Sequence, residues 1–250
     1  ESADGFFQGP YTAADNAAHG ELWTAMVPGE RAIIELFVPD EVEFAPELQL
    51  TAVSRGYRGL LSQAKFRGDQ GSCNIDVVCP EGDEWRDEIR AIARYTFVDG
   101  AFTYLCTGNL VRDVPGSLTP YFLTAAHCGV TDSNDQSVVV YWNFESGACG
   151  DLDGFPGSWA DNQSGAILRA ARGGPPSDGD NDMRLLELEE APDASFNVYY
   201  AGWDARTATR PAGGVCIHHP SGEAKAIAFN DDVLTITSSC IGSSSARWMP

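Results

Sequence analysis

Short apolar runs separated by turn residues dominate the chain from Cys73 onward. Many of these runs are rich in β-branched or aromatic residues, and Gly, Asp, Asn and Ser fill the gaps between them. Runs of this kind predict a β-sandwich or a β-barrel. The predicted strands are 91–98, 103–112, 120–125, 137–143, 165–171, 183–188, 197–203, 214–218, 224–229 and 233–238.

Two stretches depart from the strand pattern. Residues 82–90 predict one short helix, and residues 150–181, rich in Gly, Asp, Pro and Ser, predict long surface loops with a short strand inside. No run approaches the 18 apolar residues that a membrane-spanning helix needs, so we expect no membrane partner.

The first seventy residues differ in character from the rest, because every cysteine lies beyond residue 72. Apolar runs broken by Pro and Gly predict a small β-rich segment here, with strands at 22–27, 32–38 and 48–53.

A polar connector follows at residues 62–72 and carries Lys65 and Arg67. Such a stretch suits an exposed, cleavable linker. We therefore expect a β-rich segment with its linker over residues 1–70 and a larger domain over residues 71–250.

The charge balance excludes one class of partner. With 16 basic residues scattered among 36 acidic ones, the net charge is −20, whereas nucleic-acid binding needs clustered Lys and Arg. Solubility explains the charge, and attraction of basic substrates stays open. The only lysines are Lys65 and Lys225, which fits either a composition bias or a lysine-cleaving enzyme that spares itself.

The cysteines are dispersed, and no pair has zinc-finger or CxxC spacing. Dispersed cysteines in a loop-rich chain predict disulfides and an oxidising compartment. They number seven, so at least one lacks a partner within this chain: Cys73, Cys79, Cys106, Cys128, Cys149, Cys216 and Cys240.

The strongest local signal is the sequence YFLTAAHC at 121–128, where an apolar strand ends just before His127. An imidazole titrates near neutral pH, so it can take a proton from a hydroxyl and return it to a leaving group. A disulfide at Cys128 would hold the turn, and Cys106 on the preceding strand is the candidate partner. Closing a loop of about twenty residues contributes ~3 kcal/mol.

These residues resemble the trypsin-like serine proteases, and among them the bacterial lysyl endopeptidase family. The resemblance covers about residues 71–220 and is carried by GSCNIDVVCPEG at 71–82, CTGNLV at 106–111, YFLTAAHC at 121–128, VVVYWNF at 138–144, LLEL at 185–188, AGWD at 201–204 and IHHP at 217–220. It implies an all-β fold of two antiparallel chymotrypsin-like β-barrels, the second incomplete.

The resemblance also implies roles for two residues. His127 would be the catalytic base, and Asp182, which opens an apolar strand, would be the acid that orients it. Asp178 and Asp180 are the competing acids. An EF-hand calcium loop would need Gly where Met183 stands, so calcium is disfavoured.

No metal or cofactor is expected elsewhere. The neighbours His218 and His219 would point to opposite faces of a strand and would not easily share one ion. In the resembling family, IHHP belongs to the framework.

A serine protease needs a nucleophile in a Gly-rich turn such as G-[DS]-S-G. The nearest sequence, Gly242-Ser243-Ser244-Ser245-Ala246, lacks the Gly after the serine and comes before the expected last strand. We therefore expect the nucleophile beyond Pro250, in a chain that is a fragment.

The resemblance also implies the cysteine pairing. Cys79–Cys149 and Cys106–Cys128 are its pairs, and Cys216–Cys240 is a plausible additional pair. Cys73 would then pair beyond the nucleophile.

The expected function is a secreted or periplasmic serine endopeptidase, a monomer that cleaves proteins or peptides after Lys, or after Lys and Arg. Cutting the connector after Lys65 or Arg67 would free the mature enzyme. Two alternatives stay open: a protease-like binding protein without a nucleophile, and a secreted β-rich adhesion or carbohydrate-binding protein.

Overall fold

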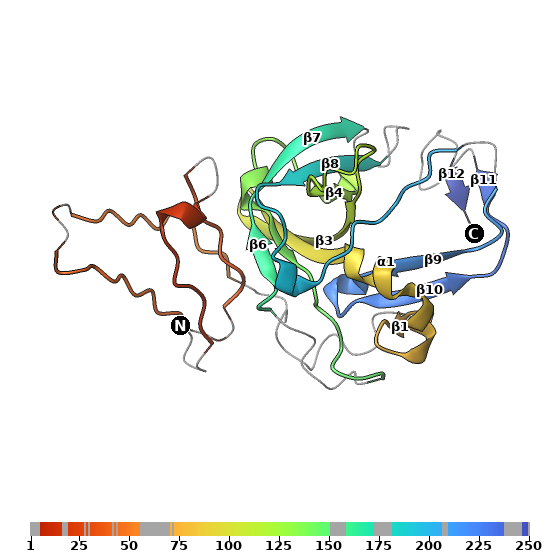
Figure 1. Ribbon diagram of the computed structural model, residues 1–250, viewed down its shortest axis with the longest axis horizontal. Helices are drawn as coiled ribbons and strands as arrows, with labels where there is room; N and C mark the ends of the chain where they lie inside the picture. The colour runs from red at the N-terminus through yellow and green to blue at the C-terminus, as the bar shows by residue number, and fades with distance from the viewer. Residues whose placement is uncertain are drawn as a thin grey trace.

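The computed structural model describes residues 6–16, 20–27, 29, 31–41, 43, 45–55, 71, 73–150, 159–172, 182–206, 210–237 and 247–249. Within these residues every pair of neighbouring strands is antiparallel, and the strands form three sheets (Figure 1).

The largest sheet has the strand order β6-β5-β2-β3-β4-β8-β7. Its strands are β2 (Ile92–Asp99), β3 (Phe102–Val111), β4 (Tyr121–Thr124), β5 (Val139–Tyr141), β6 (Asn162–Ser164), β7 (Ala166–Arg172) and β8 (Met183–Leu188).

The two ends of this sheet are one piece of chain, because only Gly165 separates β6 from β7. The Gly165 N–H donates a hydrogen bond to the Val138 carbonyl beside β5 at 2.9 Å, and its own carbonyl accepts one from the Glu189 N–H beside β8 at 3.2 Å. Its φ of +88° supplies the bend between the two strands. The sheet therefore closes on itself as a barrel.

Alternating residues of each strand fill the barrel. Along β2, Ala93, Tyr95 and Phe97 point into one apolar cluster, as the two-residue period of a strand requires. Phe122 stacks edge-to-face on Tyr95 and on Trp142, with ring centroids 5.6 and 5.9 Å apart. The cluster is completed by Leu110, Val130, Val138, Val140, Ala166, Leu186 and Leu188.

Two smaller sheets are built mostly from the last strands of the chain, β9 to β12, drawn in blue in Figure 1, with β1, drawn in gold, added to one of them. One has the order β1-β10-β9, with β1 (Ile75–Asp76), β9 (Gly214–His218) and β10 (Ala226–Asn230), and the other pairs β11 (Thr235–Thr237) with β12 (Arg247–Met249). The first packs against the helical turns before β2 through Val77, Ile89 and Ile227.

Those turns are η2 (Pro80–Trp85), a 3-10 helix, and α1 (Arg86–Ala91). They confirm that the helix predicted at 82–90 lies here, although half of it is 3-10. The other 3-10 turns of the described chain are η1 (Ala13–Asp15), η3 (Ala126–Cys128), η4 (Asp135–Ser137), η6 (Ala194–Phe196) and η7 (Pro220–Gly222).

A buried lysine joins the barrel to the second sheet. Lys225 has no exposed surface, and its Nζ donates to the carbonyls of Ile89 and Trp142 and to the Glu145 carboxylate, at 2.9, 3.0 and 2.9 Å. Burial lowers the pKa of Lys225, while Glu145 acts in the opposite direction. All three ammonium protons are satisfied, which is what a buried charge requires.

The all-β prediction is confirmed, and most predicted strands lie within one or two residues of observed ones. The strand predicted at 197–203 is wrong. There the chain runs beside the end of β3 and bonds to it only around Ala201, whose N–H donates to Leu110 and whose carbonyl accepts from Arg112.

The strands predicted within the first seventy residues are also wrong. Residues 22–27 pack on the barrel through their side chains and form no strand with backbone hydrogen bonds to it. The runs 32–38 and 48–53 form no strand in the described chain beyond a single bridge residue, Ala32, and large side chains there stay exposed, Phe37 by 83% and Val53 by 78%. The predicted boundary at residue 70 remains a prediction.

Barrel closure at Gly165 gives the first testable prediction. A Cβ at Gly165 would lie 3.0 Å from the Glu189 side chain and would impose a left-handed φ on alanine. Gly165→Ala should therefore lower the free energy of unfolding by about 1–3 kcal/mol. Urea unfolding measures the change. Gly147, which has open space around it and no positive φ, is the matched control; equal stability of Gly165→Ala and Gly147→Ala would contradict the role of Gly165.

Candidate active site

The register between β4 and β8 brings His127 to Asp182. Thr124 at the end of β4 pairs with Arg184 near the start of β8. Because the strands are antiparallel, the residues that follow Thr124 meet those that precede Arg184 at the same edge of the barrel. The 3-10 turn η3, which follows β4 at that edge, carries His127, and Gly129, at φ +98°, ends the turn.

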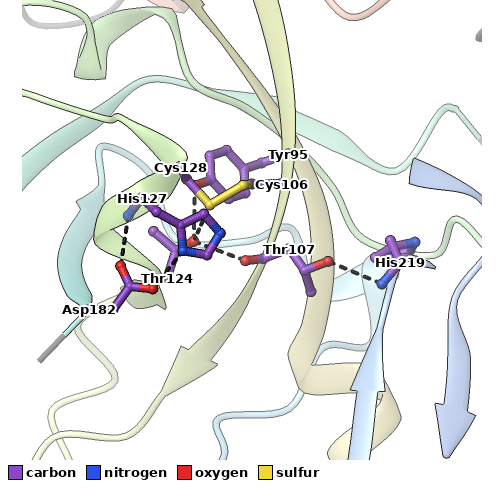
Figure 2. The surroundings of a disulfide bond; sticks show 8 residues. All are labelled: Tyr95, Cys106, Thr107, Thr124, His127, Cys128, Asp182 and His219. Carbon is purple, nitrogen blue, oxygen red and sulfur yellow. Dashed lines mark hydrogen bonds and ion pairs between the residues drawn. A yellow bond between two sulfur atoms is a disulfide. The ribbon is translucent and has the colours of Figure 1, made fainter. Parts of the chain in front are cut away.

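Asp182 holds His127 at two points (Figure 2). Its Oδ2 lies 2.5 Å from the imidazole Nδ1, and its Oδ1 accepts a hydrogen bond of 2.7 Å from the His127 backbone N–H. The carboxylate side chain is mostly buried, whereas the imidazole is 54% exposed. Asp182 therefore fixes both the ring and the turn that carries it.

Burial of Asp182 would raise the pKa of its carboxyl, but hydrogen bonds from the side chain and backbone of His127 outweigh that effect, so the pKa lies below its ordinary value. The group is thus an acceptor-only carboxylate at neutral pH, and Nδ1 of His127 must carry the proton between them. Nε2 is left as the basic nitrogen, on a ring that solvent and ligands can reach.

A disulfide and a hydrogen-bond chain support the turn from below. Cys106 on β3 is bonded to Cys128 beside His127. Thr124 Oγ1 bonds to the Tyr95 hydroxyl at 2.9 Å and donates to the Thr107 carbonyl at 2.9 Å. Figure 2 shows these side chains behind the imidazole, rooted in the barrel strands.

A pocket of about 290 Å³ opens beside the pair. Thr107 and Gly108 of β3 line one side, Ala125 and Asp182 another, and Ile217 of β9 faces them from the second sheet. The pair therefore stands where the barrel meets the smaller sheet.

The two histidines of IHHP bond to different partners. His218 Nε2 donates to Asn74 Oδ1 at 3.0 Å, and burial lowers the pKa of His218. His219 is buried, with its Nδ1 on the Glu223 carbonyl at 2.9 Å. Burial, then the charges of Lys225 and Arg94, hold the pKa of His219 well below its ordinary value, so it stays neutral.

The remaining predicted residues divide into two groups. The disulfides Cys79–Cys149 and Cys106–Cys128 are confirmed, and Cys73 and Cys216 are free within the described chain. The others lie outside the described residues: Lys65, Arg67, Asp178, Asp180, Cys240 and Ser243–Ser245.

Two further properties concern only the described part of the chain. No three His, Cys, Asp or Glu side chains gather there as a metal ion would need. No helix of that part is long and apolar enough to cross a membrane. The two disulfides are consistent with an extracytoplasmic location.

Sequence reasoning missed the hydrogen-bonded supports of the turn, Tyr95, Thr107 and Thr124. It also missed the two buried cations elsewhere on the barrel, Arg94 and Lys225. One signal was present: Arg94 interrupts an otherwise apolar strand.

Comparison with known proteins identifies the family of this chain. The family described as lysyl endopeptidase, C-terminal domain, matches residues 67–249, and the chain belongs to this family. The resemblance found in the sequence is thus confirmed.

A curated relative is the lysyl endopeptidase of Pseudomonas aeruginosa, 28% identical over 221 residues that cover 84% of this chain and 46% of that protein. The chain thus spans about half the length of this relative.

Solved structures similar to this chain include the protease Anisep from Arthrobacter nicotinovorans. It is 16% identical, with 70% of this chain and 80% of that chain covered, at a TM-score of 0.43. The thermostable serine protease AL20 from an extremophilic microorganism is 13% identical, with 65% and 79% covered, at a TM-score of 0.38.

The lowered pKa of Asp182 predicts that the free energy of unfolding decreases at acidic pH. Because the folded pKa lies below the unfolded value, the ionised carboxylate stabilises the fold above the unfolded pKa, and this contribution is lost as the pH falls through the folded pKa. The stability difference between wild type and Asp182→Asn should shrink as the pH falls from about 5 to about 2.

Urea unfolding at a series of pH values measures this difference. The exposed Asp132 supplies the control variant, Asp132→Asn. If the stability difference between wild type and Asp182→Asn stays constant over this pH range, the ionised Asp182 does not stabilise the fold through its two bonds to His127.

Proposed function

We propose that this chain carries the His–Asp half of a serine endopeptidase that hydrolyses peptide bonds through an acyl-enzyme. The observation that carries the proposal is the two-point bond of Asp182, which lines a pocket, to His127 in a chain of the lysyl endopeptidase family. These 250 residues contain no G-[DS]-S-G sequence, so the proposal does not assign the nucleophilic serine to any of them.

In this mechanism the serine hydroxyl attacks the peptide carbonyl while its proton passes to Nε2 of His127. The imidazolium then gives that proton to the leaving amine as the tetrahedral adduct collapses to an ester. Water attacks the ester by the same route, and the serine recovers its proton. Asp182 keeps Nδ1 protonated and stabilises the imidazolium throughout.

Cleavage after Lys, or after Lys and Arg, is part of the proposal. The relative's name, lysyl endopeptidase, supports it. A net charge of −20 would also favour encounter with basic substrates. The proposal assigns no residue of this chain to the acidic floor of the specificity pocket.

The setting proposed for the enzyme is secreted or periplasmic, as a monomer that acts on proteins or peptides without nucleic acid, membrane or cofactor. Cutting after Lys65 or Arg67 frees the mature enzyme. N-terminal sequencing of the secreted protein tests this step, and a mature start well upstream of Phe66 would contradict it.

A second candidate is a protease-like binding protein without a nucleophile, favoured by the lack of a G-[DS]-S-G turn in these residues. Loss of the serine alone lowers turnover on the order of 10⁶-fold. Reading the coding sequence past Pro250 separates the two: a G-[DS]-S-G turn within roughly thirty codons supports the enzyme, and an immediate stop supports the binding protein.

The catalytic roles predict a sharp loss of turnover in the full-length protein. His127→Ala should lower kcat by about 10⁴- to 10⁶-fold, and Asp182→Asn by about 10⁴-fold, with the fold retained. Hydrolysis of peptides that differ only in Lys, Arg or Leu before the scissile bond measures both rate and specificity.

The matched control is His218→Ala, which removes a histidine that bonds to Asn74 rather than to Asp182. This variant should keep its turnover. Equal losses in His218→Ala and His127→Ala, or full activity in His127→Ala, would sink the assignment.

A further inference from the structure

The outer face of β5 carries an aromatic cluster. Val140 and Trp142 point into the barrel, so Val139 and Tyr141 point outward by the alternation of a strand. There Trp159 stacks edge-to-face on Tyr141 at 5.4 Å and packs on Phe144 at 4.7 Å between ring centroids. These four side chains are at most 4% exposed although they face outward, so another part of the chain must cover them.

A cation lies beneath this cluster. The Arg94 guanidinium carbon is 3.6 Å from the Phe144 ring centroid and 4.6 Å from that of Trp159, and the residue is 1% exposed. Its Nη1 donates to the Gly222 carbonyl at 2.9 Å, and burial lowers the pKa of Arg94 to about 10. In place of water, the guanidinium has the Gly222 carbonyl and the ring faces of Phe144 and Trp159, so a buried Arg94 depends on these groups keeping their positions.

The cover is the beginning of the chain. Ala25 is 2% exposed within the cluster, and Phe6, Trp23 and Met26 pack against it. The Met26 N–H donates to the Tyr141 hydroxyl at 3.1 Å, which fixes the position of the segment along β5. The contact is thus both apolar and directional. We name residues 6–16 and 20–27 the covering segment.

The covering segment is itself braced and makes a second contact. Gln8 Nε2 donates to the Met26 carbonyl at 3.3 Å, which ties its two arms together. Trp23 also lines a pocket of about 260 Å³ with Val98 and Gly100, at the turn between β2 and β3, and with Ser137. Trp23 thus lies between the aromatic cluster and this pocket at the β2–β3 turn.

The aromatic cluster and the pocket at Trp23 lie away from His127 and Asp182. In the sheet, β5 is separated from β4 by both β2 and β3. Figure 1 shows the red N-terminal residues on the side of the barrel near β6, with the second sheet on the far side. The covering segment therefore does not occupy the site.

We propose that the covering segment stays docked on the outer face of β5 after the connector is cut, as a noncovalent subunit that stabilises the barrel. The proposal depends on the proposed function only for the cut itself. The occupant of the aromatic face is thus this chain's own N-terminal segment, and the mature enzyme is a two-piece complex.

The test uses the full-length precursor with His127→Ala, so that no self-cleavage is needed, and with a recognition site for an unrelated protease inserted in the connector. After that protease has cut the chain, gel filtration should show both pieces eluting together at micromolar concentration. The midpoint of thermal unfolding should rise with protein concentration, because dissociation is linked to unfolding. Separate elution of the two wild-type pieces overturns the proposal, whether or not the protein proves to be a protease.

Peptides of residues 6–27 give a readout that does not require a variant protein to fold. A labelled wild-type peptide should exchange into the cut protein. The Ala25→Arg peptide should bind at least about 100-fold more weakly, because it places a charge in the apolar cluster. The Ala13→Arg peptide, changed at an exposed position of η1, should bind like wild type. Equal binding of both variants, or no binding of the wild-type peptide, overturns the proposal.

Removal of the Tyr141 hydroxyl tests the directional contact alone. In Tyr141→Phe the Met26 N–H loses its acceptor, while the ring and the barrel fold remain. The peptide should bind about fivefold more weakly. Unchanged affinity would place the segment elsewhere on the barrel and overturn the assigned docking surface.

Discussion

Closure of the barrel at Gly165 is the constraint on which the rest of the structure depends. β6 pairs with β5, β7 pairs with β8, and Gly165 joins the two strands, so one continuous segment satisfies both edges of the sheet. Closure fixes β8 beside β4, and that pairing places the residue before β8 against the turn after β4. The contact between Asp182 and His127 is therefore a consequence of strand register, reinforced by two hydrogen bonds.

The outside of the barrel is held by buried cations rather than by apolar packing alone. Lys225 bonds to three acceptors from different parts of the chain, and Arg94 lies on aromatic rings with one carbonyl acceptor. Burying a charge costs several kcal/mol unless its partners are well placed. Each cation therefore stabilises one arrangement of the barrel and the loops around it, since a shifted loop would leave the charge unsatisfied.

The sequence predicted the parts whose signals are local. Alternating apolar runs predicted most strands, and the resemblance predicted the His127–Asp182 pairing and two disulfides. It did not predict Arg94 or Lys225 as buried, because their acceptors, such as Gly222 and Ile89, are more than a hundred residues away. It wrongly predicted strands at 22–27, where apolar side chains cover the barrel without a ladder. An apolar run has the same pattern whether it forms a strand or only packs its side chains on a barrel.

The first barrel and its edge organise the histidine and the acid without help from a nucleophile. Every bond that orients His127 comes from Asp182, and every support beneath it comes from β2, β3 and β4. A protease and a nucleophile-free relative would therefore share this geometry, because nothing in it responds to the serine. What distinguishes them is whether a hydroxyl reaches Nε2 of the imidazole, a ring that is 54% exposed.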